Sequence, residues 1–403
     1  MKKIVSDYEG LVVRSETKVT EEIIAAANKL RVIARAGIGV DNIDVSAATN
    51  AGIAVINAPT GNIIAAAEHT MGLIISSARH IPQAAASMRS GSWDRGDFMG
   101  IELKNKTLGI IGAGKVGSEV AKRAKSFEMN ILAYDPFISS ERASRLGMEL
   151  VNMETLLGAS DFVTIHTPYM AATENMLSKE QFDLMKNGSK LINVARGELI
   201  DDDALLEALN SGKISTAALD VFRDEPNIDI RLSEHPSVIS TPHLGGSTAE
   251  AQEAVAMEAA EQMVDILDGS FGKNIVNAPM LGPENQSVIS PMIPVAELIG
   301  KLAIGLSEGQ FRSVGLIYEG EISEYETSVL KSAFLSGFIQ GTTNEQVNAI
   351  NAPLIASARG LEVSEQKQRI EGEYSSLITA VLNTSQGQLL LSGTSSRDEV
   401  HLV

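Results

Sequence analysis

The feature that most limits the fold of this chain is a regular alternation of short apolar runs with helix-like stretches between residues 10 and about 245. The apolar runs are nearly continuous, which is typical of strands covered on both faces. This alternation predicts a parallel, doubly wound α/β sheet. Strands are expected at 10–13, 31–37, 52–59, 107–114, 130–135, 162–168, 190–197, 216–222 and 237–246, and helices at 20–30, 65–81, 118–127 and 248–268.

A different pattern follows a stretch at 277–286 in which prolines begin to cluster, as they do in domain linkers. A helix is expected at 295–311, a strand at 313–320, and a β-hairpin within 375–393. We therefore predict a separate α/β module from 281 to 403, which agrees with the two to three domains that 403 residues suggest.

Charge and cysteine content exclude several classes of function. The formal net charge is −18 and the isoelectric point is near 4.8, so nucleic acid is not an expected partner. The chain has no cysteine, which excludes disulfides, thiol nucleophiles and zinc–thiolate sites, and no metal site is predicted. No apolar run long enough to cross a membrane and no signal-like segment are recognised, so a cytoplasmic protein without a membrane partner is expected.

The strongest local motif is GAGKVG at residues 112–117, a G-x-G-x-x-G that follows an expected strand and opens an expected helix. Gly112 allows the tight turn, Gly114 lets the backbone approach a pyrophosphate, and Gly117 lets helix and strand pack closely. Asp135 follows the next strand and can accept hydrogen bonds from the adenosine ribose hydroxyls. A carboxylate there repels a 2′-phosphate, so the sequence predicts NAD rather than NADP.

Hydride transfer at a carbon that bears a hydroxyl needs an acid/base group that titrates near pH 7, usually histidine. His243 lies in TPHLGG at the carboxyl end of an expected strand, where α/β sheets place ligands. The other five histidines are assigned packing, loop or surface roles: His69, His80, His166, His235 and His401. For His166, a role in shaping the cofactor cleft stays open.

Two further residues follow neighbouring strands. Glu225 in DVFRDEP is a suitable carboxylate to orient the His243 ring, although it could equally be a solvated loop acid beside Asp224. Arg196 in NVARGE can hold a substrate carboxylate with its forked guanidinium group. Three strand ends are thus expected to converge on one cleft.

Taken together, these motifs resemble the D-isomer-specific 2-hydroxyacid dehydrogenases. The resemblance rests on GAGKVG with YDP (134–136), HTP (166–168), NVARGELID (193–201), LDVFRDEP (219–226) and STPHLGGSTAEAQ (240–252). VVRSETKVT (12–20), RAGIGVDNID (35–44), NAPTGNIIAAAEHT (57–70) and the module from 281 point to a long type within that family.

The resemblance implies a Rossmann NAD-binding domain at 59–246 inserted in a flavodoxin-like substrate domain made of 1–58 and 247–280, followed by an intervening α/β domain at 281–403. It implies NAD-dependent oxidation of 3-phospho-D-glycerate to 3-phosphohydroxypyruvate, the first step of L-serine synthesis, by a homodimer or homotetramer. GSWDRGDFMG (91–100) resembles the arm through which Trp93 would approach a neighbouring subunit.

The family's roles carry over by residue. His243 would be the acid/base, Glu225 its partner, and Arg196 the carboxylate clamp. The cofactor contacts would be Gly112, Gly114, Lys115, Val116, Gly117, Asp135, Thr167, Pro168, Val194, Ala195, Asp220 and Gly245. The substrate contacts would be Arg14, Arg35, Gly37, Ile38 and Arg196, with Arg14 and Arg35 facing a phosphate.

Two departures from the family pattern carry expectations of their own. Only nine residues precede Gly10, too few for a strand and a parallel crossover. We therefore expect either that a segment is deleted or that residues 2–9 are the tail of a lost helix, and in both cases that the substrate domain is incomplete. A C-terminal serine-binding (ACT) domain is not recognised.

Two other functions stay open: a glyoxylate or hydroxypyruvate reductase, and a non-catalytic NAD-sensing protein like the corepressors of this superfamily.

Overall fold

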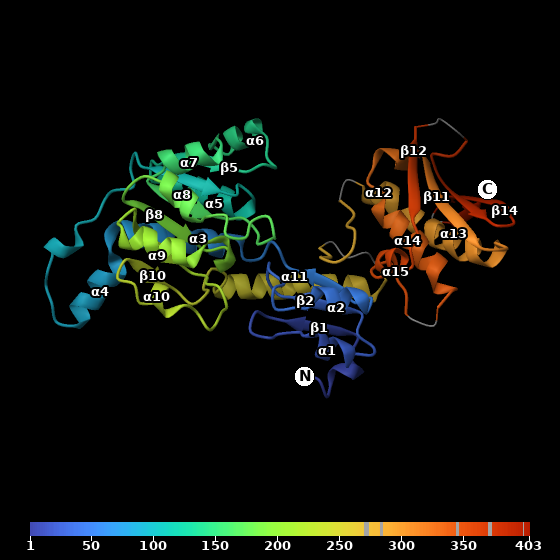
Figure 1. The fold of residues 1–403 in the computed structure, drawn as a ribbon, viewed down its shortest axis with the longest axis horizontal. Helices are drawn as coiled ribbons and strands as arrows, with labels where there is room; N and C mark the ends of the chain where they lie inside the picture. Colours follow the sequence, from blue (N-terminus) through green and yellow to red (C-terminus); the bar gives the residue numbers. More distant parts are fainter. Residues whose placement is uncertain (270–273, 283–284, 344–345, 370–372, 398) are drawn as a thin grey trace. The chain divides into compact units, whose positions relative to one another are not determined.

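The structure is a computed structural model that describes residues 1–269, 274–282, 285–343, 346–369, 373–397 and 399–403. The chain divides into two compact units, one made of residues 61–254 and the other of residues 1–60 with 255–403 (Figure 1). The exact boundaries at 58/59, 246/247 and 280/281 stay predictions, and parts of the expected linker and module (283–284, 344–345, 370–372 and 398) lie outside the described residues.

The unit of residues 61–254 is built on a seven-stranded sheet in which every pair is parallel, with the order β10-β9-β8-β7-β4-β5-β6. The strand order reverses between β4 and β7, as in a doubly wound nucleotide-binding sheet. The strands are β4 (Thr107–Ile111), β5 (Asn130–Tyr134), β6 (Glu149–Leu150), β7 (Phe162–Ile165), β8 (Ser189–Asn193), β9 (Ile214–Leu219) and β10 (Val238–Ser240). The predicted fold class is confirmed.

Helices cover both faces of this sheet, which explains why its strands read as continuous apolar runs. One core joins the sheet to α3 (Ile63–Arg79) and α5 (Lys115–Ser126), and a second joins it to α7 (Met153–Ala159), α8 (Lys179–Leu184) and α9 (Asp202–Asn210). The helix expected at 65–81 ends earlier, because His80 adopts a left-handed conformation and a separate α4 (Ile81–Arg89) follows. The short helices α6 (Ser140–Arg145) and α10 (Ile230–Ser233) complete the layers.

A smaller parallel sheet with the order β1-β2-β3 lies in the first 60 residues. Its strands are β1 (Gly10–Val13), β2 (Val32–Arg35) and β3 (Ala54–Asn57), with α1 (Glu21–Ala25) and α2 (Val45–Asn50) between them. The helix expected at 248–268 is α11 (Ala249–Leu267), whose buried Val255 and Ala259 pack on β2 and β3. Residues 5–7 form a single 3₁₀ turn and not a strand.

The C-terminal module has a five-stranded sheet with the order β12-β11-β13-β14-β15. The predicted hairpin is confirmed as β13 (Ser376–Thr384) and β14 (Gly387–Ser396), beside β11 (Phe311–Gly320). β12 (Val363–Gln368) and β15 (Glu399–Leu402) were not predicted, because their mostly polar sequences show no apolar run. The described helices are α12 (Gln286–Ile289), α13 (Ile293–Leu306), α14 (Ser328–Gln340) and α15 (Ala352–Ala358).

One described stretch, Gln286–Leu306, is long and apolar enough to cross a membrane by length and composition, with a mean hydropathy of 1.5. From the sequence, no apolar run of that length was expected. Within α13, Val295 and Ile299 are fully buried in the core of the module. The apolar character of this helix is therefore accounted for by its packing inside a folded domain.

Candidate active site

Three neighbouring parallel strands bring the predicted catalytic residues to one edge of the large sheet. Arg196 follows β8, Glu225 follows β9 and His243 follows β10, and the last residues of these strands pair as Asn193↔Leu219 and Leu219↔Ser240. Because carboxyl ends of parallel strands meet at the same edge, residues far apart in sequence become neighbours. The expected convergence of three strand ends is confirmed.

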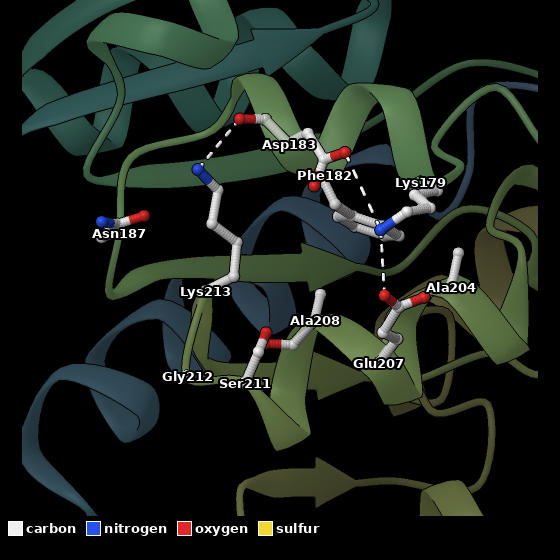
Figure 2. A pocket seen from close by; sticks show the side chains of 10 residues that line it. All are labelled: Lys179, Phe182, Asp183, Asn187, Ala204, Glu207, Ala208, Ser211, Gly212 and Lys213. Carbon is white, nitrogen blue, oxygen red and sulfur yellow. Dashed lines mark hydrogen bonds and ion pairs between the residues drawn. The ribbon is translucent and has the colours of Figure 1, made fainter.

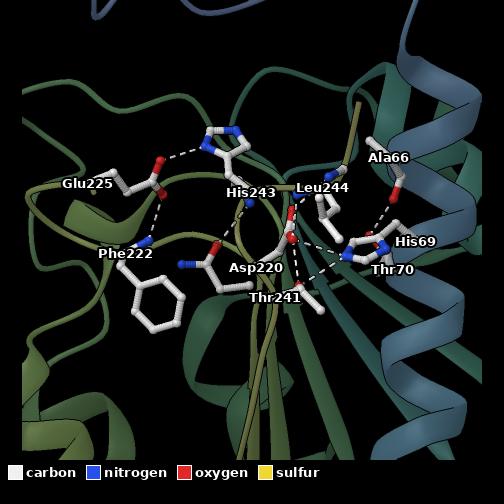
Figure 3. A network of polar contacts seen from close by, with 12 residues as sticks. Ala66, His69, Thr70, Asp220, Phe222, Glu225, Thr241, His243 and Leu244 are labelled. Atoms are coloured by element: carbon white, nitrogen blue, oxygen red, sulfur yellow. Dashed lines mark hydrogen bonds and ion pairs between the residues drawn. The ribbon is translucent and has the colours of Figure 1, made fainter. Parts of the chain in front are cut away.

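The central contact of the site joins His243 and Glu225. Nδ1 of His243 lies 2.7 Å from Oε2 of Glu225, and the backbone N–H of Phe222 donates to Oε1 at 2.9 Å (Figure 3). Burial alone would raise the pKa of Glu225, but the hydrogen bonds from His243 and Phe222, with the charge of Arg196, outweigh it and hold this pKa below its usual value. Glu225 is therefore ionised at neutral pH, and although it lies in an exposed loop, its carboxylate contacts His243.

An ionised Glu225 determines which nitrogen of His243 carries the proton. A carboxylate only accepts hydrogen bonds, so Nδ1 must be the donor and the neutral ring has its lone pair on Nε2. The His243 side chain is 40% exposed, so part of the ring is accessible to solvent. In this geometry Nε2 of His243 is able to accept one proton.

Arg196 is held by its own loop. Its Nη1 donates to Ala195 O at 2.6 Å, and the fully buried Asn193 ties the turn together by donating from Nδ2 to Arg196 O and accepting from Ala195 N. The charge of Arg196 acts on Glu225, which places the guanidinium group on the same side as the acid/base pair. Sequence reasoning did not single out Asn193, although its place at the end of a buried strand was visible.

The glycine loop has the shape that a dinucleotide needs. Gly112 has φ of 94°, and a Cβ on it would strike the backbone of His166, while a Cβ on Gly117 would strike Gly112 O. A Cβ on Gly114 would meet nothing within 4 Å, so the backbone at the N-terminus of α5 faces open space. The free amides and partial positive charge of that helix end suit a pyrophosphate.

Asp135 lies beside this loop, at the end of β5. Its Oδ2 accepts from Ala113 N at 2.9 Å and its Oδ1 accepts from Phe137 N at 2.8 Å. The carboxylate is thus fixed next to the glycine turn, where the sequence expected it to meet a ribose. The residues present fit a bound dinucleotide.

Other predicted cofactor residues also gather at this edge. Gly245 lies between the side chains of Val194 and Asp220, and its N–H donates to Asp220 Oδ2 at 2.8 Å. Thr167 follows β7 beside Gly112. The remaining members of the set are placed as follows: Lys115 and Val116 open α5, Pro168 is exposed after Thr167, and Ala195 adjoins Arg196.

His166 is excluded as an acid/base group at neutral pH. Burial lowers the pKa of His166 to about 4, and its Nε2 lies 3.0 Å from Thr164 Oγ1. Its backbone N–H donates to Ile111 O, so the residue packs beneath the glycine turn. The structure therefore assigns His166 to the packing beneath the glycine turn.

His69 was expected to pack or to face solvent, and the structure adds a polar contact that this expectation did not include. The ring of His69 points from α3 toward Asp220, with Nε2 3.0 Å from Asp220 Oδ1 and 3.2 Å from Thr241 Oγ1 (Figure 3). The apolar composition of α3 hid this contact, because a single histidine in such a helix carries no signal of its own. The partner is 151 residues away in sequence.

The predicted substrate residues of the first 60 residues form a cluster of their own at the carboxyl edge of the small sheet. Val13 pairs with Arg35, so Arg14 and the turn at Gly37 and Ile38 adjoin each other. Arg14 is exposed, and Arg35 donates from Nη1 to Ala36 O and packs against Gly37. Asn57 Nδ2 donates to Ile38 O at 2.6 Å, which fixes this turn.

A surface pocket of about 450 Å³ lies elsewhere on the unit, between α8 and α9 (Figure 2). Its two lysines are engaged: Lys179 forms an ion pair with Glu207 at 2.9 Å, and Lys213 donates to Asp183 O at 2.9 Å. Lys213 precedes β9, so the pocket lies at the amino ends of the strands, opposite the catalytic residues. It is not part of the site.

Comparison with protein families gives two matches. The NAD-binding domain of the D-isomer specific 2-hydroxyacid dehydrogenases matches residues 71–245, and the D-3-phosphoglycerate dehydrogenase intervening domain matches residues 288–403. Among curated relatives, D-3-phosphoglycerate dehydrogenase of Archaeoglobus fulgidus is 42% identical over 99% of this chain and 76% of its own length. The enzyme of Methanocaldococcus jannaschii is 45% identical over 96% of this chain and 74% of its own.

Solved structures give the same picture for about two thirds of the chain. D-lactate dehydrogenase of Escherichia coli, in its apo form, has a TM-score of 0.63 and 30% identity, covering 68% of this chain and 89% of its own. D-lactate dehydrogenase of Aquifex aeolicus, solved with NAD and lactic acid, has a TM-score of 0.62 and 30% identity, covering 69% and 90%.

Proposed function

Because this chain belongs to the D-isomer specific 2-hydroxyacid dehydrogenase family, we propose that it oxidises 3-phospho-D-glycerate to 3-phosphohydroxypyruvate with NAD, the first step of L-serine synthesis. Its relatives that carry the name D-3-phosphoglycerate dehydrogenase match over nearly the whole chain, and the module from 288 matches their intervening domain. The single observation that carries the proposal is the His243–Glu225 pair, with Arg196 beside it, at the edge of an NAD-binding sheet.

His243 acts as the base. Its Nε2 lone pair takes the proton of the C2 hydroxyl, and the ring then carries a positive charge between that nitrogen and Glu225. The ionised Glu225 stabilises this charge at 2.7 Å and keeps the ring in the productive orientation. In the reverse direction the same nitrogen returns the proton to the C2 oxygen of the oxo acid.

Arg196 binds the substrate carboxylate. A guanidinium group presents its donors in a planar fork that matches the two carboxylate oxygens. The turn fixed by Asn193 keeps this fork near Glu225, so the C2 carbon next to the bound carboxylate is directed to His243. Fixing the carboxylate and the hydroxyl together orients the C2 hydrogen for removal.

The cofactor supplies the hydride acceptor. The residues that would hold it are the glycine turn from Gly112 to Gly117, the N-terminus of α5, and Asp135 at the ribose. The acidic side chain supports NAD over NADP, because a carboxylate that is already fixed there would repel a 2′-phosphate. Gly245 and Val194 would line the nicotinamide end.

The phosphate needs a cationic site, because the chain carries a net charge of −18 that repels a trianionic substrate at a distance. Arg14, exposed at the end of β1, and Arg35, at the end of β2, are the groups we assign to the phosphate. Gly37 and Ile38 would present backbone groups to the rest of the substrate. A substrate without phosphate would gain nothing from Arg14.

Replacing His243 tests the proposal directly. In the His243→Ala variant we expect turnover of 3-phospho-D-glycerate to fall by at least a hundredfold, which is the usual contribution of a general acid/base group. The affinity for NADH, followed by its fluorescence, should stay within about threefold, because the glycine turn is untouched. The matched control is His401→Leu, which removes an exposed histidine of β15 and should keep full activity.

A substrate panel separates this function from its two rivals. Equal activity on glyoxylate or hydroxypyruvate, with no effect of Arg14→Ala on the KM for the phosphorylated acid, would identify a reductase without a phosphate site. NADH binding without turnover of any 2-oxo acid would identify a sensing protein. Full activity of His243→Ala on 3-phospho-D-glycerate would remove the proposed mechanism.

We also propose that the protein is cytoplasmic. Support comes from composition, since a chain without cysteine has no disulfide to gain from an oxidising compartment. Cell fractionation with antibodies to the chain tests this location, and recovery in a membrane or secreted fraction would contradict it.

A further inference from the structure

A buried carboxylate lies directly beneath the catalytic histidine. The side chain of Asp220, the residue after β9, is 0% exposed. A buried charge of this kind is tolerated only where several donors surround it. Here Oδ1 accepts from Thr241 Oγ1 at 2.6 Å and from Leu244 N at 2.7 Å, and Oδ2 accepts from Gly245 N at 2.8 Å.

His69 supplies one more donor to the same carboxylate, from the opposite side. Its Nε2 lies 3.0 Å from Asp220 Oδ1, and its side chain is 22% exposed on α3 (Figure 3). Burial alone would raise the pKa of Asp220, but the hydrogen bonds from His69, Thr241 and Leu244 outweigh it and lower this pKa. Asp220 is thus an acceptor only, and Nε2 of His69 must carry a proton.

The carboxylate connects this histidine to the catalytic loop. His243 N donates to Asp220 O at 2.8 Å, and the next two residues donate to the Asp220 side chain. His243 itself has φ of 55°, a left-handed conformation that a residue with a side chain adopts only when its surroundings impose it. Because the ring of His243 is 40% exposed, little packing is available to impose that conformation. Hydrogen bonds hold it instead: those to Asp220, the bond from His243 N to Thr241 O at 3.0 Å, and the contact of the ring with Glu225.

We propose that His69 is a positioning residue for His243, acting through Asp220 to hold the loop 243–245 in the one backbone conformation that directs the base at the substrate. The inference rests on the proposed function of His243. It adds a residue from α3, one of the helices that cover the large sheet. His69 touches neither substrate nor cofactor in this scheme. Thr241 is the second member of the network, because it donates to the same Oδ1 and lies 3.2 Å from Nε2 of His69.

A purely structural histidine would behave differently from a positioning one. Losing a packing group on α3 would lower stability and disturb cofactor and substrate binding together. Losing the donor to Asp220 lets the carboxylate rotate, and the loop 243–245 then samples other conformations. Since the glycine turn and Arg196 lie outside this network, we expect the loss to fall on kcat and to spare the KM for 3-phospho-D-glycerate.

The test compares His69→Leu with His69→Gln. Leucine fills the space without donating, and glutamine places an N–H donor at nearly the reach of Nε2. We expect kcat of the Leu variant to fall about tenfold, the size of one lost hydrogen bond to a charged group, while the KM for 3-phospho-D-glycerate stays within about threefold. The Gln variant should recover most of the lost kcat.

A second variant keeps the inference testable if the Leu variant does not fold. Thr241→Val removes a donor from the same oxygen without touching α3, and the same selective loss of kcat is expected. Where both single variants fold, their effects should be less than additive, because both act through Asp220. His401→Leu again serves as the control that removes an exposed histidine.

The outcomes are separable from those of the proposed function. An inactive parent chain, or an active His243→Ala variant, would contradict the proposed function itself. An inactive His243→Ala variant beside a fully active His69→Leu variant would overturn only the positioning role. Equal loss in the Leu and Gln variants, with KM and stability affected together, would also overturn it in favour of simple packing.

Discussion

At the residue scale, three histidines of one domain are set apart by what surrounds them. His243 meets a carboxylate at one nitrogen and is 40% exposed, which suits the proposed role as a base. His69 meets a buried carboxylate and donates to it. His166 is partly buried beside a hydroxyl, and desolvation lowers its pKa to about 4. The residue type alone would have allowed any of the three to be the catalytic group.

The low pKa of His166 predicts a loss of stability in acid. The unfolded chain binds the proton near pH 6.5 and the folded chain only near pH 4, so the unfolded state is favoured as pH falls through that window. At pH 5 the difference amounts to about 2 kcal/mol. Between pH 8 and pH 5, the free energy of unfolding should fall less in His166→Asn than in the parent chain, by about that amount. Urea unfolding followed by circular dichroism measures this. An unchanged pH slope in the variant would contradict the prediction.

At the scale of elements, the turn between β4 and α5 shows how much a short segment decides. Gly112 and Gly117 are required by close backbone approaches, and Gly114 leaves the helix end open. Asp135 at the end of β5 is tied to this same turn through Ala113 N. We therefore expect one strand–turn–helix unit and the strand beside it to set both the binding of a dinucleotide and the choice between NAD and NADP.

Replacing Asp135 should change that choice. In Asp135→Ser we expect kcat/KM for NAD to fall by about tenfold to a hundredfold, because hydrogen bonds to a charged acceptor are lost. The value for NADP should rise, since the repulsion of the 2′-phosphate is removed. Steady-state kinetics with both cofactors measures this. Asp183→Asn, an exposed acid at the far end of the sheet, is the matched control and should leave the preference unchanged. An unaltered NAD preference in Asp135→Ser would show that other residues set it.

At the scale of the whole molecule, the segment after α3 stands out because it buries almost nothing. α4 has no buried residue, Trp93 is 70% exposed and Met99 is 81% exposed. Apolar side chains gathered on one exposed segment commonly mark an interface. We propose that a second copy of the chain covers this segment in a homodimer or homotetramer.

Assembly through this segment predicts the effect of two substitutions. In the double variant Trp93→Glu and Met99→Glu, we expect sedimentation to show monomers at concentrations where the parent chain is a dimer or tetramer, because buried charge opposes association. Trp93 is the sole tryptophan, so in the parent chain its emission should shift to the red when dilution dissociates the assembly. Leu390→Glu, an exposed apolar residue of β14, is the control. A parent chain that is monomeric, or a double variant that still associates, would contradict the proposed interface.

Much of the architecture could be predicted from sequence because it depends on local patterns. Continuous apolar runs predicted β4, β5, β7, β8, β9 and β10, and the glycine turn and Asp135 followed from their spacing. The residues Arg196, Glu225 and His243 were predicted from the rule that parallel strands present ligands at their carboxyl ends. The two-residue strand β6 and the polar strands β12 and β15 were missed, because neither length nor apolar content marks them.

Sequence by itself thus determined the fold class, the nucleotide turn and the strand ends that carry the three proposed catalytic side chains, because each is encoded in a short window or at a strand end. Only the tertiary structure decided which neighbours these side chains have. It paired Glu225 with His243, made Glu225 ionised, desolvated His166, and brought His69 to Asp220 across 151 positions of sequence. Charge state and orientation depend on distances of a few ångströms between distant segments, and no local pattern specifies those distances.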